Sequence, residues 1–183
     1  MRKLFIVVFL IFLSASAVHA QMQLPFEYQQ VVKKLISEFG KKSTTHYTED
    51  PAEVSSSTLI DFAKKLIGIP YRYATSNPNV GFDCSGFVNY VFSNFGFNVP
   101  RSSTEFANTG NETSLKECKV GDVLVFTGSN PKIRQIGHVG IVYSVDGDKI
   151  SFIHATSGKA HGVTITELND YYKSRFLKVM RIL

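Results

Sequence analysis

Apolar residues recur at helical spacing in the first half of the chain and at alternating positions in the second half. The helical segments, each followed by a glycine, cover residues 28–39, 57–67 and 84–95. Apolar residues three and four positions apart predict amphipathic helices, and a glycine just beyond such a stripe is typical of a helix C-terminus. We expect the Ser57 hydroxyl to cap the second helix, and the third helix to begin at Asp83 or Cys84.

Beyond Pro100 the apolar pattern predicts strands. The candidates are residues 123–126, 139–145, 149–155, 163–165 and 176–182. The turn sequence Asp146-Gly147-Asp148 separates the second candidate from the third and predicts a hairpin. Helices followed by antiparallel strands indicate an α+β fold rather than a parallel βαβ sheet.

The first twenty residues are typical of a signal peptide. Arg2 and Lys3 precede an apolar run over residues 4–13, and Val18-His19-Ala20 suits signal-peptidase cleavage before Gln21. A retained membrane anchor is the alternative, but the apolar run is shorter than the ~20 residues that span a bilayer. We therefore expect a protein exported to the periplasm or the extracellular space, with no stable membrane anchor after cleavage.

The remainder divides into a helical extension and linker over residues 21–56 and one domain over residues 57–183. Removing Arg2 and Lys3 lowers the formal net charge from +5 to +3. This charge is too small to indicate a nucleic-acid partner, and no block of Lys and Arg occurs. It suits an anionic polymer only weakly.

Cys84 is the candidate nucleophile. A thiol at a helix N-terminus lies near the positive end of the helix dipole and near unpaired backbone N–H groups, which favour the thiolate. The same N–H groups can bind the oxyanion formed when sulfur attacks an amide, and Gly86 leaves room for a substrate backbone. The alternatives are a buried core cysteine and a disulfide with Cys118, the other cysteine of the chain.

His138 is the candidate base, because neutral imidazole can accept the thiol proton and return it to a leaving amine. If the hairpin turn centres on Gly147, His154 faces Gly140 and lies diagonally from His138 on the same face of the sheet, where it can orient that ring. A two-residue turn would place the two histidines on opposite faces. His161 is a competing third residue, in a loop flanked by glycine.

A metal site is a further alternative. One cysteine and two histidines can hold zinc with an open position. However, no Cys-x-x-Cys or His-x-x-x-His pair is present. We expect neither a metal nor an organic cofactor.

From about Ser57 to the C-terminus the chain resembles the NlpC family of papain-like cell-wall endopeptidases. The motifs that carry the resemblance are Gly68-Ile-Pro-Tyr71, Phe82-Asp-Cys-Ser-Gly-Phe87, Pro100-Arg-Ser-Ser103, Gly121-Asp-Val-Leu-Val-Phe126, Gly137-His-Val-Gly-Ile141 and Ile153-His-Ala155. Six such motifs in this order and spacing are highly specific. The resemblance implies a papain-like fold, with helices packed on a central antiparallel sheet and the cysteine at a helix N-terminus.

The resemblance also implies Cys84 as nucleophile, His138 as base and His154 as the third polar residue of a cysteine peptidase. The implied substrate is the peptidoglycan stem peptide, cut between γ-D-glutamyl and the diamino acid. Tyr71, Asp83 and Ser85 match family positions that line the substrate groove.

One segment departs from the family pattern. Residues 73–75 read Tyr-Ala-Thr where an aromatic residue and two glycines are usual, which can alter the groove near the nucleophile. An amidase or acyltransferase using the same cysteine remains an alternative reading. So does a binding module that has lost catalysis.

Overall fold

The computed structural model describes residues 55–183. The predicted signal peptide, the predicted helix over residues 28–39 and nearly all of the predicted extension lie outside the described residues, so they remain predictions. Within residues 55–183, no helix is both long enough and apolar enough to cross a bilayer.

The two predicted helices of the domain are present as α3 (Ser56–Lys64) and α4 (Cys84–Ser93). α3 is capped by Ser55, not by Ser57 as predicted, because the Ser55 hydroxyl accepts the backbone N–H of Thr58. At the start of α4, the Asp83 carboxylate accepts the Gly86 N–H at 2.7 Å. A short polar side chain at this position satisfies a backbone donor that the helix itself leaves unpaired.

All five predicted strands form, within one antiparallel sheet of six. Its strands are β3 (Asn111–Thr113), β4 (Val123–Thr127), β5 (Ile136–Asp146), β6 (Lys149–Thr156), β7 (Gly162–Glu167) and β8 (Phe176–Arg181), in the spatial order β3-β8-β4-β5-β6-β7. This architecture confirms the predicted α+β, papain-like fold.

Several short elements were not predicted from the sequence. These are the two-stranded sheet of β1 (Ser76–Asn77) and β2 (Gly81–Phe82), the 3₁₀ helices η1 (Ser103–Asn108) and η2 (Leu115–Glu117), strand β3, and helix α5 (Asp170–Arg175). Each has six residues or fewer. They are mostly polar, so no repeated apolar pattern marks them in the sequence.

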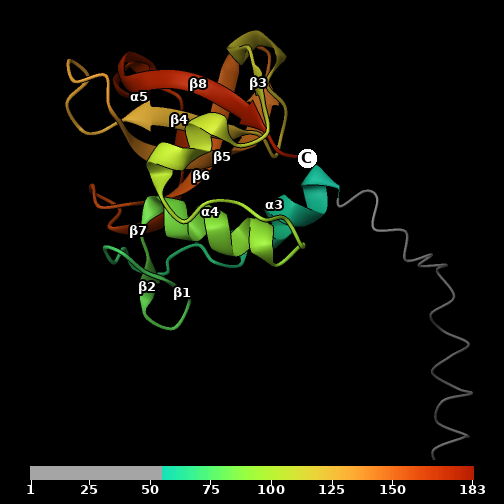
Figure 1. Cartoon of the computed structure of the whole chain (residues 1–183), viewed down its shortest axis with the longest axis vertical. Coiled ribbons are helices and arrows are strands. Elements are labelled where there is room, and N and C mark those ends of the chain that lie inside the picture. Colours follow the sequence, from blue (N-terminus) through green and yellow to red (C-terminus); the bar gives the residue numbers. More distant parts are fainter. Residues whose placement is uncertain (1–54) are drawn as a thin grey trace, which may run out of the picture. The chain divides into compact units, whose positions relative to one another are not determined.

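Hydrophobic clusters cover the sheet on both faces. On β4, Val123 and Val125 pack with buried residues of α3 and α4, whereas Leu124 and Phe126 pack with Tyr172 of α5. Figure 1 shows α3 and α4 together along one side of the sheet. Because side chains alternate along β4, one face of the sheet packs against α3 and α4 and the other packs against α5.

The turn of the β5–β6 hairpin is shorter than predicted. Asp146 pairs with Lys149, which leaves a two-residue loop, so the prediction of a turn centred on Gly147 is wrong. The tight turn is possible because Gly147 adopts a positive φ of 55°. With this turn alone, His138 and His154 would lie on opposite faces of the sheet.

A β-bulge restores the predicted relationship between the histidines. The register shifts between Val142 and Ser144, so that Ile141 pairs with Ile153. The extra residue in β5 shifts its pairing by one position, which moves every preceding side chain to the other face relative to β6. His138 and His154 therefore share a face, but for a reason that the predicted turn did not include.

Candidate active site

Cys84 is the first residue of α4, and its side chain reaches the beginning of β5. The pairing of β5 with β6 ends at Ile141 and Ile153, so the first residues of β5 extend beyond it. The sulfur of Cys84 lies 4.0 Å from the carbonyl oxygen of Gly137 and donates to it. The thiol therefore contacts the polar backbone at the beginning of β5.

Burial decides the protonation of Cys84. The residue is only 9% exposed, and burial together with the Asp83 carboxylate raises the pKa of the thiol. The backbone N–H groups of Val139, Ser85 and Cys84 itself act in the opposite direction but do not outweigh burial. The backbone N–H groups thus favour the thiolate, as predicted, but burial outweighs them, and the resting group is a thiol.

His138 and His154 form a directly bonded pair, as the sequence predicted. The Nε2 atom of His138 lies 2.7 Å from Nδ1 of His154. Burial, and then the neighbouring His154, lowers the pKa of His138 well below its ordinary value. His154 is 0% exposed, and burial followed by the charge of Arg175 lowers its pKa to about 3. Both rings are neutral at neutral pH.

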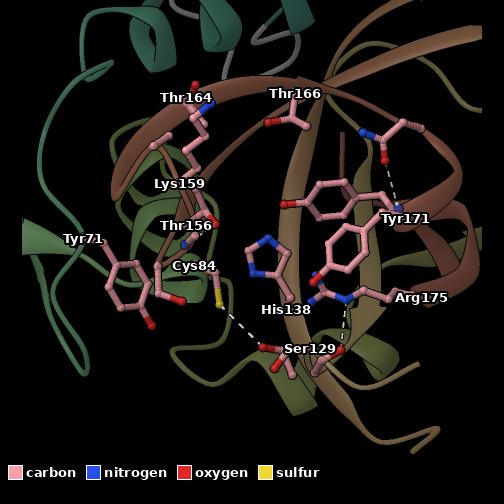
Figure 2. A pocket seen from close by; sticks show the side chains of 17 residues that line it. Tyr71, Cys84, Ser129, His138, Thr156, Lys159, Thr164, Thr166, Tyr171 and Arg175 are labelled. Carbon is pink, nitrogen blue, oxygen red and sulfur yellow. Dashed lines mark hydrogen bonds between the residues drawn. The ribbon is translucent and has the colours of Figure 1, made fainter. Parts of the chain in front are cut away.

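The hydrogen bonds around the two rings are consistent with one set of tautomers for a base facing Cys84. In Figure 2 the free ring nitrogen of His138, Nδ1, lies on the side of the ring toward the Cys84 sulfur. If Nδ1 is to accept a proton, Nε2 carries the hydrogen and donates it to Nδ1 of His154. The Nε2–H of His154 then donates to the Thr166 hydroxyl, 2.9 Å away.

Cys84 and His138 share a pocket but are not hydrogen-bonded to each other among the described residues. The thiol points to the carbonyl of Gly137 instead, as the dashed line in Figure 2 shows. Nucleophile–base contacts are often loose without substrate, so this geometry is compatible with a base role for His138.

Gly86 and Gly140 leave room for parts of the protein itself. A Cβ at Gly86 would lie 2.3 Å from the carbonyl oxygen of Thr75, so the predicted space for a substrate backbone is occupied by the chain's own loop. A Cβ at Gly140 would lie 3.0 Å from the Cβ of His154. The absence of a side chain at Gly140 therefore lets His154 lie close to β5.

Asp83 and Ser85, two of the predicted substrate-binding residues, are bound to Arg101. Both nitrogens of the Arg101 fork bond Asp83, with NH1 2.9 Å from Oδ1 and NH2 2.6 Å from Oδ2. Arg101 NH1 also donates to the Ser85 hydroxyl at 3.2 Å. Asp83 is 7% exposed and caps α4, so this cluster holds the nucleophile's helix in place.

Two pockets meet at Cys84, Tyr71 and Gly137. The histidine-side pocket, of about 940 Å³, includes His138, Thr156, Lys159, Thr166, Tyr171 and Arg175 in its lining. The Asp83-side pocket, of about 460 Å³, includes Tyr73, Asp83, Ser85, Arg101, Ser102 and Glu105. All three predicted substrate-binding residues therefore line one or both pockets.

His161 does not contact the candidate base. It lies in an exposed turn, and its ring centroid is 6.1 Å from that of Tyr71. His154, not His161, is the histidine bonded to His138.

The cysteines are free, and they lie on opposite faces of the sheet. Cys84 belongs to the cluster under α3 and α4, whereas Cys118 belongs to the cluster under α5. The alternative of a Cys84–Cys118 disulfide is therefore wrong.

Metal binding finds no support in the part of the chain from residue 55 onward. No group of three or more His, Cys, Asp or Glu there has a geometry suited to a metal ion. His138 and His154, the two histidines considered as metal ligands, use their facing nitrogens to bond each other.

Four residues around the site were not singled out by the sequence analysis. They are Thr166, which bonds His154, Arg175 and Tyr172 beside the two histidines, and Lys159 on the pocket wall. Arg101 belongs to the motif Pro100-Arg-Ser-Ser103, but the sequence predicted no role for it. Thr166 has a recognisable signal, because it lies diagonally across β6 and β7 from His154. The others come from α5 or from a turn, for which the sequence carried no clear pattern.

The chain is similar in sequence to proteins of known name. The chain is 38% identical over 134 residues to a gamma-DL-glutamyl hydrolase of Bacillus subtilis. This alignment covers 72% of this chain and 30% of that protein. It is 34% identical over 130 residues to the murein DD-endopeptidase MepS/murein LD-carboxypeptidase of Escherichia coli, covering 69% of this chain and 63% of that protein. The chain thus spans less than two thirds of each relative.

A solved structure and the match to a protein family both point to the same family. An NlpC/P60 family protein from Bacillus cereus superposes with a TM-score of 0.62 at 28% identity, over 70% of this chain and 40% of that one. The NlpC/P60 family itself matches residues 68–181. These residues include every candidate site residue from Tyr71 to Thr166, and the chain belongs to the NlpC/P60 family.

Proposed function

We propose that this protein is an exported cysteine endopeptidase that hydrolyses peptidoglycan stem peptides between γ-D-glutamyl and the diamino acid. The observation that carries the proposal is that Cys84, at the N-terminus of α4, lines the same pocket as His138, which is bonded to His154. The names of its relatives, a gamma-DL-glutamyl hydrolase and a murein endopeptidase, support peptidoglycan stem peptides as the substrate class.

In the proposed reaction, His138 acts first as base and then as acid. As the Cys84 sulfur attacks the γ-carbonyl carbon, its proton passes to Nδ1 of His138. The resulting oxyanion is held by the backbone N–H groups of Cys84 and Ser85 at the N-terminus of α4, which also lower the pKa of the resting thiol. His138 then returns the proton to the departing amine, leaving an acyl-enzyme on Cys84.

Water completes the cycle. His138 takes a proton from the attacking water, and collapse of the second tetrahedral intermediate releases the γ-D-glutamyl carboxylate and the Cys84 thiol. His154 keeps the hydrogen of His138 on Nε2 throughout, so that Nδ1 faces the reaction. No metal or organic cofactor is needed for these steps.

The choice of bond rests on the relatives' names and on the family resemblance. The Bacillus subtilis relative is named for γ-DL-glutamyl bonds, and the Escherichia coli relative for a DD bond. We favour the γ-D-glutamyl bond because the relative named for it has the higher identity. An amidase or acyltransferase would break a different bond with the same Cys84, and a binding module would break none.

The decisive experiment uses protein purified from cells that express the full chain, kept reduced, and incubated with defined stem peptides. Mass spectrometry should identify a fragment ending in the γ-D-glutamyl carboxyl, and the Cys84→Ala variant should produce none. Cys118→Ala is the matched control and should remain active. A fragment cut at another bond would replace the proposed specificity, and no fragment from folded protein would favour the binding module.

The same preparation tests export. Processing after Ala20 predicts a protein in the extracytoplasmic fraction whose N-terminal residue is Gln21. An intact N-terminus in the membrane fraction would instead support the retained anchor.

A further inference from the structure

The two pockets that meet at Cys84 differ in charge. The Asp83-side pocket contains the acidic residues Asp83 and Glu105 as well as Arg101. The histidine-side pocket contains no Asp or Glu among its lining residues, but it contains Lys159 and Arg175. The histidine-side pocket is therefore a cationic recess next to the candidate nucleophile.

The proposed chemistry assigns this recess to the leaving half of the substrate. His138 must be within hydrogen-bond reach of the amine that departs when the acyl-enzyme forms. His138 lines only the histidine-side pocket of the two. The fragment carrying the amine, which is the diamino acid and the residues beyond it, therefore extends into that pocket, and the γ-D-glutamyl half extends toward Asp83.

Arg175 is committed to the protein. It is 6% exposed, with Nε and NH2 each 2.9 Å from a carbonyl oxygen, of Gly128 and Thr127 respectively. NH1 donates to the Tyr171 hydroxyl at 3.0 Å. Arg175 thus contributes positive potential to the pocket while its fork holds the loop after β4.

Lys159, the other cation of the pocket, forms no ion pair among the described residues. No carboxylate of the described residues lies within ion-pair distance of its ammonium group, and the residue is exposed. The turn that carries it is held by the Gly158 N–H on the Thr156 hydroxyl and by the His161 N–H on the Gly158 carbonyl. Figure 2 shows Lys159 and Arg175 on opposite sides of the His138 ring.

We infer that the histidine-side pocket recognises a carboxylate on the leaving fragment, with Lys159 as the specificity-determining residue. This inference rests on the proposed function. Two carboxylates are chemically available beyond the cleaved bond: the side-chain carboxylate of a diaminodicarboxylic acid such as diaminopimelic acid, and the C-terminal carboxylate of the stem. A stem built on lysine lacks the first of these.

The test compares kcat/KM for stems that differ only in one carboxylate. The substrates are a diaminopimelate stem, its side-chain amide and its C-terminal amide. The unmodified protein should cleave the carboxylate form about 3- to 10-fold faster than one of the amides, as expected for one partly solvated ion pair. If converting one carboxylate to its amide lowers kcat/KM, that carboxylate is the one that the pocket recognises.

Charge-matched variants show whether Lys159 causes the preference. Lys159→Gln should bring the ratio of carboxylate to amide close to one. Lys149→Gln removes an equal charge from an exposed position at the far end of β6 and should leave the ratio unchanged. A ratio that Lys159→Gln leaves at the value of the unmodified protein overturns the inference.

A binding measurement separates this inference from the proposed function. If no stem is cleaved, the proposed function fails, and the pocket is tested by titrating free diaminopimelic acid into the full-length protein and following NMR shifts. Binding that weakens in Lys159→Gln but not in Lys149→Gln supports the carboxylate site on its own. Absence of binding in the unmodified protein overturns it.

Discussion

The Nε2 atom of His138 lies 2.7 Å from Nδ1 of His154, and both rings are buried. Two neutral rings share one proton in this bond, so one of the facing nitrogens donates, the other accepts, and the tautomers of the two rings are coupled. With Nε2 of His138 as donor, its Nδ1 is left as an acceptor on the Cys84 side. In this arrangement His154 can orient the candidate base His138 and hold its tautomer without adding charge to the site.

This relationship predicts different outcomes for two His154 substitutions. Gln can still accept the Nε2–H of His138 through its side-chain oxygen, so His154→Gln should retain more activity than His154→Ala. We expect His154→Ala to lower kcat by about 100-fold or more, since a wrong tautomer removes the base. Steady-state kinetics on a stem peptide measures both, with His161→Asn as the control that should retain full activity.

Thr166 should act through His154. Thr166→Val keeps the side-chain shape but leaves the buried Nε2–H of His154 without its acceptor, which costs about 1–3 kcal/mol. We expect kcat to fall by about 10-fold with KM unchanged, and Thr166→Ser to restore it. Equal kcat in Thr166→Val and the unmodified protein would show that His154 holds its tautomer without this bond.

The raised pKa of Cys84 predicts a thiol that reacts slowly at neutral pH. In a Cys118→Ala background, the rate of alkylation by iodoacetamide should rise about 10-fold per pH unit up to and beyond pH 9, following the thiolate fraction. A resting thiolate–imidazolium pair would instead give a fast rate that is flat between about pH 5 and 8. Such a plateau would contradict the neutral resting state.

Acid should destabilise the fold through the buried histidines. The pKa of His154 is about 3 in the folded protein, and in the unfolded chain it returns to about 6.5. Protons therefore bind the unfolded state preferentially between these values. Stability is complete above about pH 6.5 and falls by up to about 1.4 kcal/mol per pH unit for this group as the pH decreases toward 3.

Urea unfolding at several pH values between 7 and 4 measures this slope. His154→Gln should flatten it, because the variant has no group at this position that titrates in the range. His161→Asn, which removes an exposed histidine from a position of positive φ, should keep the slope of the unmodified protein. A slope that His154→Gln leaves unchanged would assign the acid sensitivity to other groups.

The Arg101–Asp83 pair should stabilise the beginning of α4. Arg101→Met leaves the Asp83 carboxylate, 7% exposed, without its bidentate partner. Because Arg101 itself is partly exposed, we expect a loss of about 1–2 kcal/mol in unfolding free energy. Arg101→Lys should recover part of the loss.

A surface ion pair provides the comparison for Arg101→Met. Lys178 lies 2.7 Å from Glu112, whose side chain is 59% exposed, so Lys178→Met should cost less than about 1 kcal/mol. Urea unfolding of the two variants side by side measures the difference. Equal losses would mean that solvent, not Arg101, supplies most of the stabilisation of Asp83.

The sequence by itself predicted the elements whose pattern is local. The helix that begins at Cys84 is specified by an apolar stripe and an Asp cap, and the strands that carry His138 and His154 by alternating apolar residues. Such signals depend on residues a few positions apart, so they survive without knowledge of the fold. They suffice to predict the α+β class and to select Cys84, His138 and His154 as candidates.

The tertiary structure decided what depends on contacts between distant residues. The bulge near Tyr143 places the two histidines on one face, although the turn alone would separate them. Packing of α4 against the sheet buries Cys84 and raises its pKa above the value that the helix dipole alone favours. The register depends on which residues of β5 and β6 pair, and the burial of Cys84 depends on packing against residues far away in the sequence; both are decided only in the folded chain.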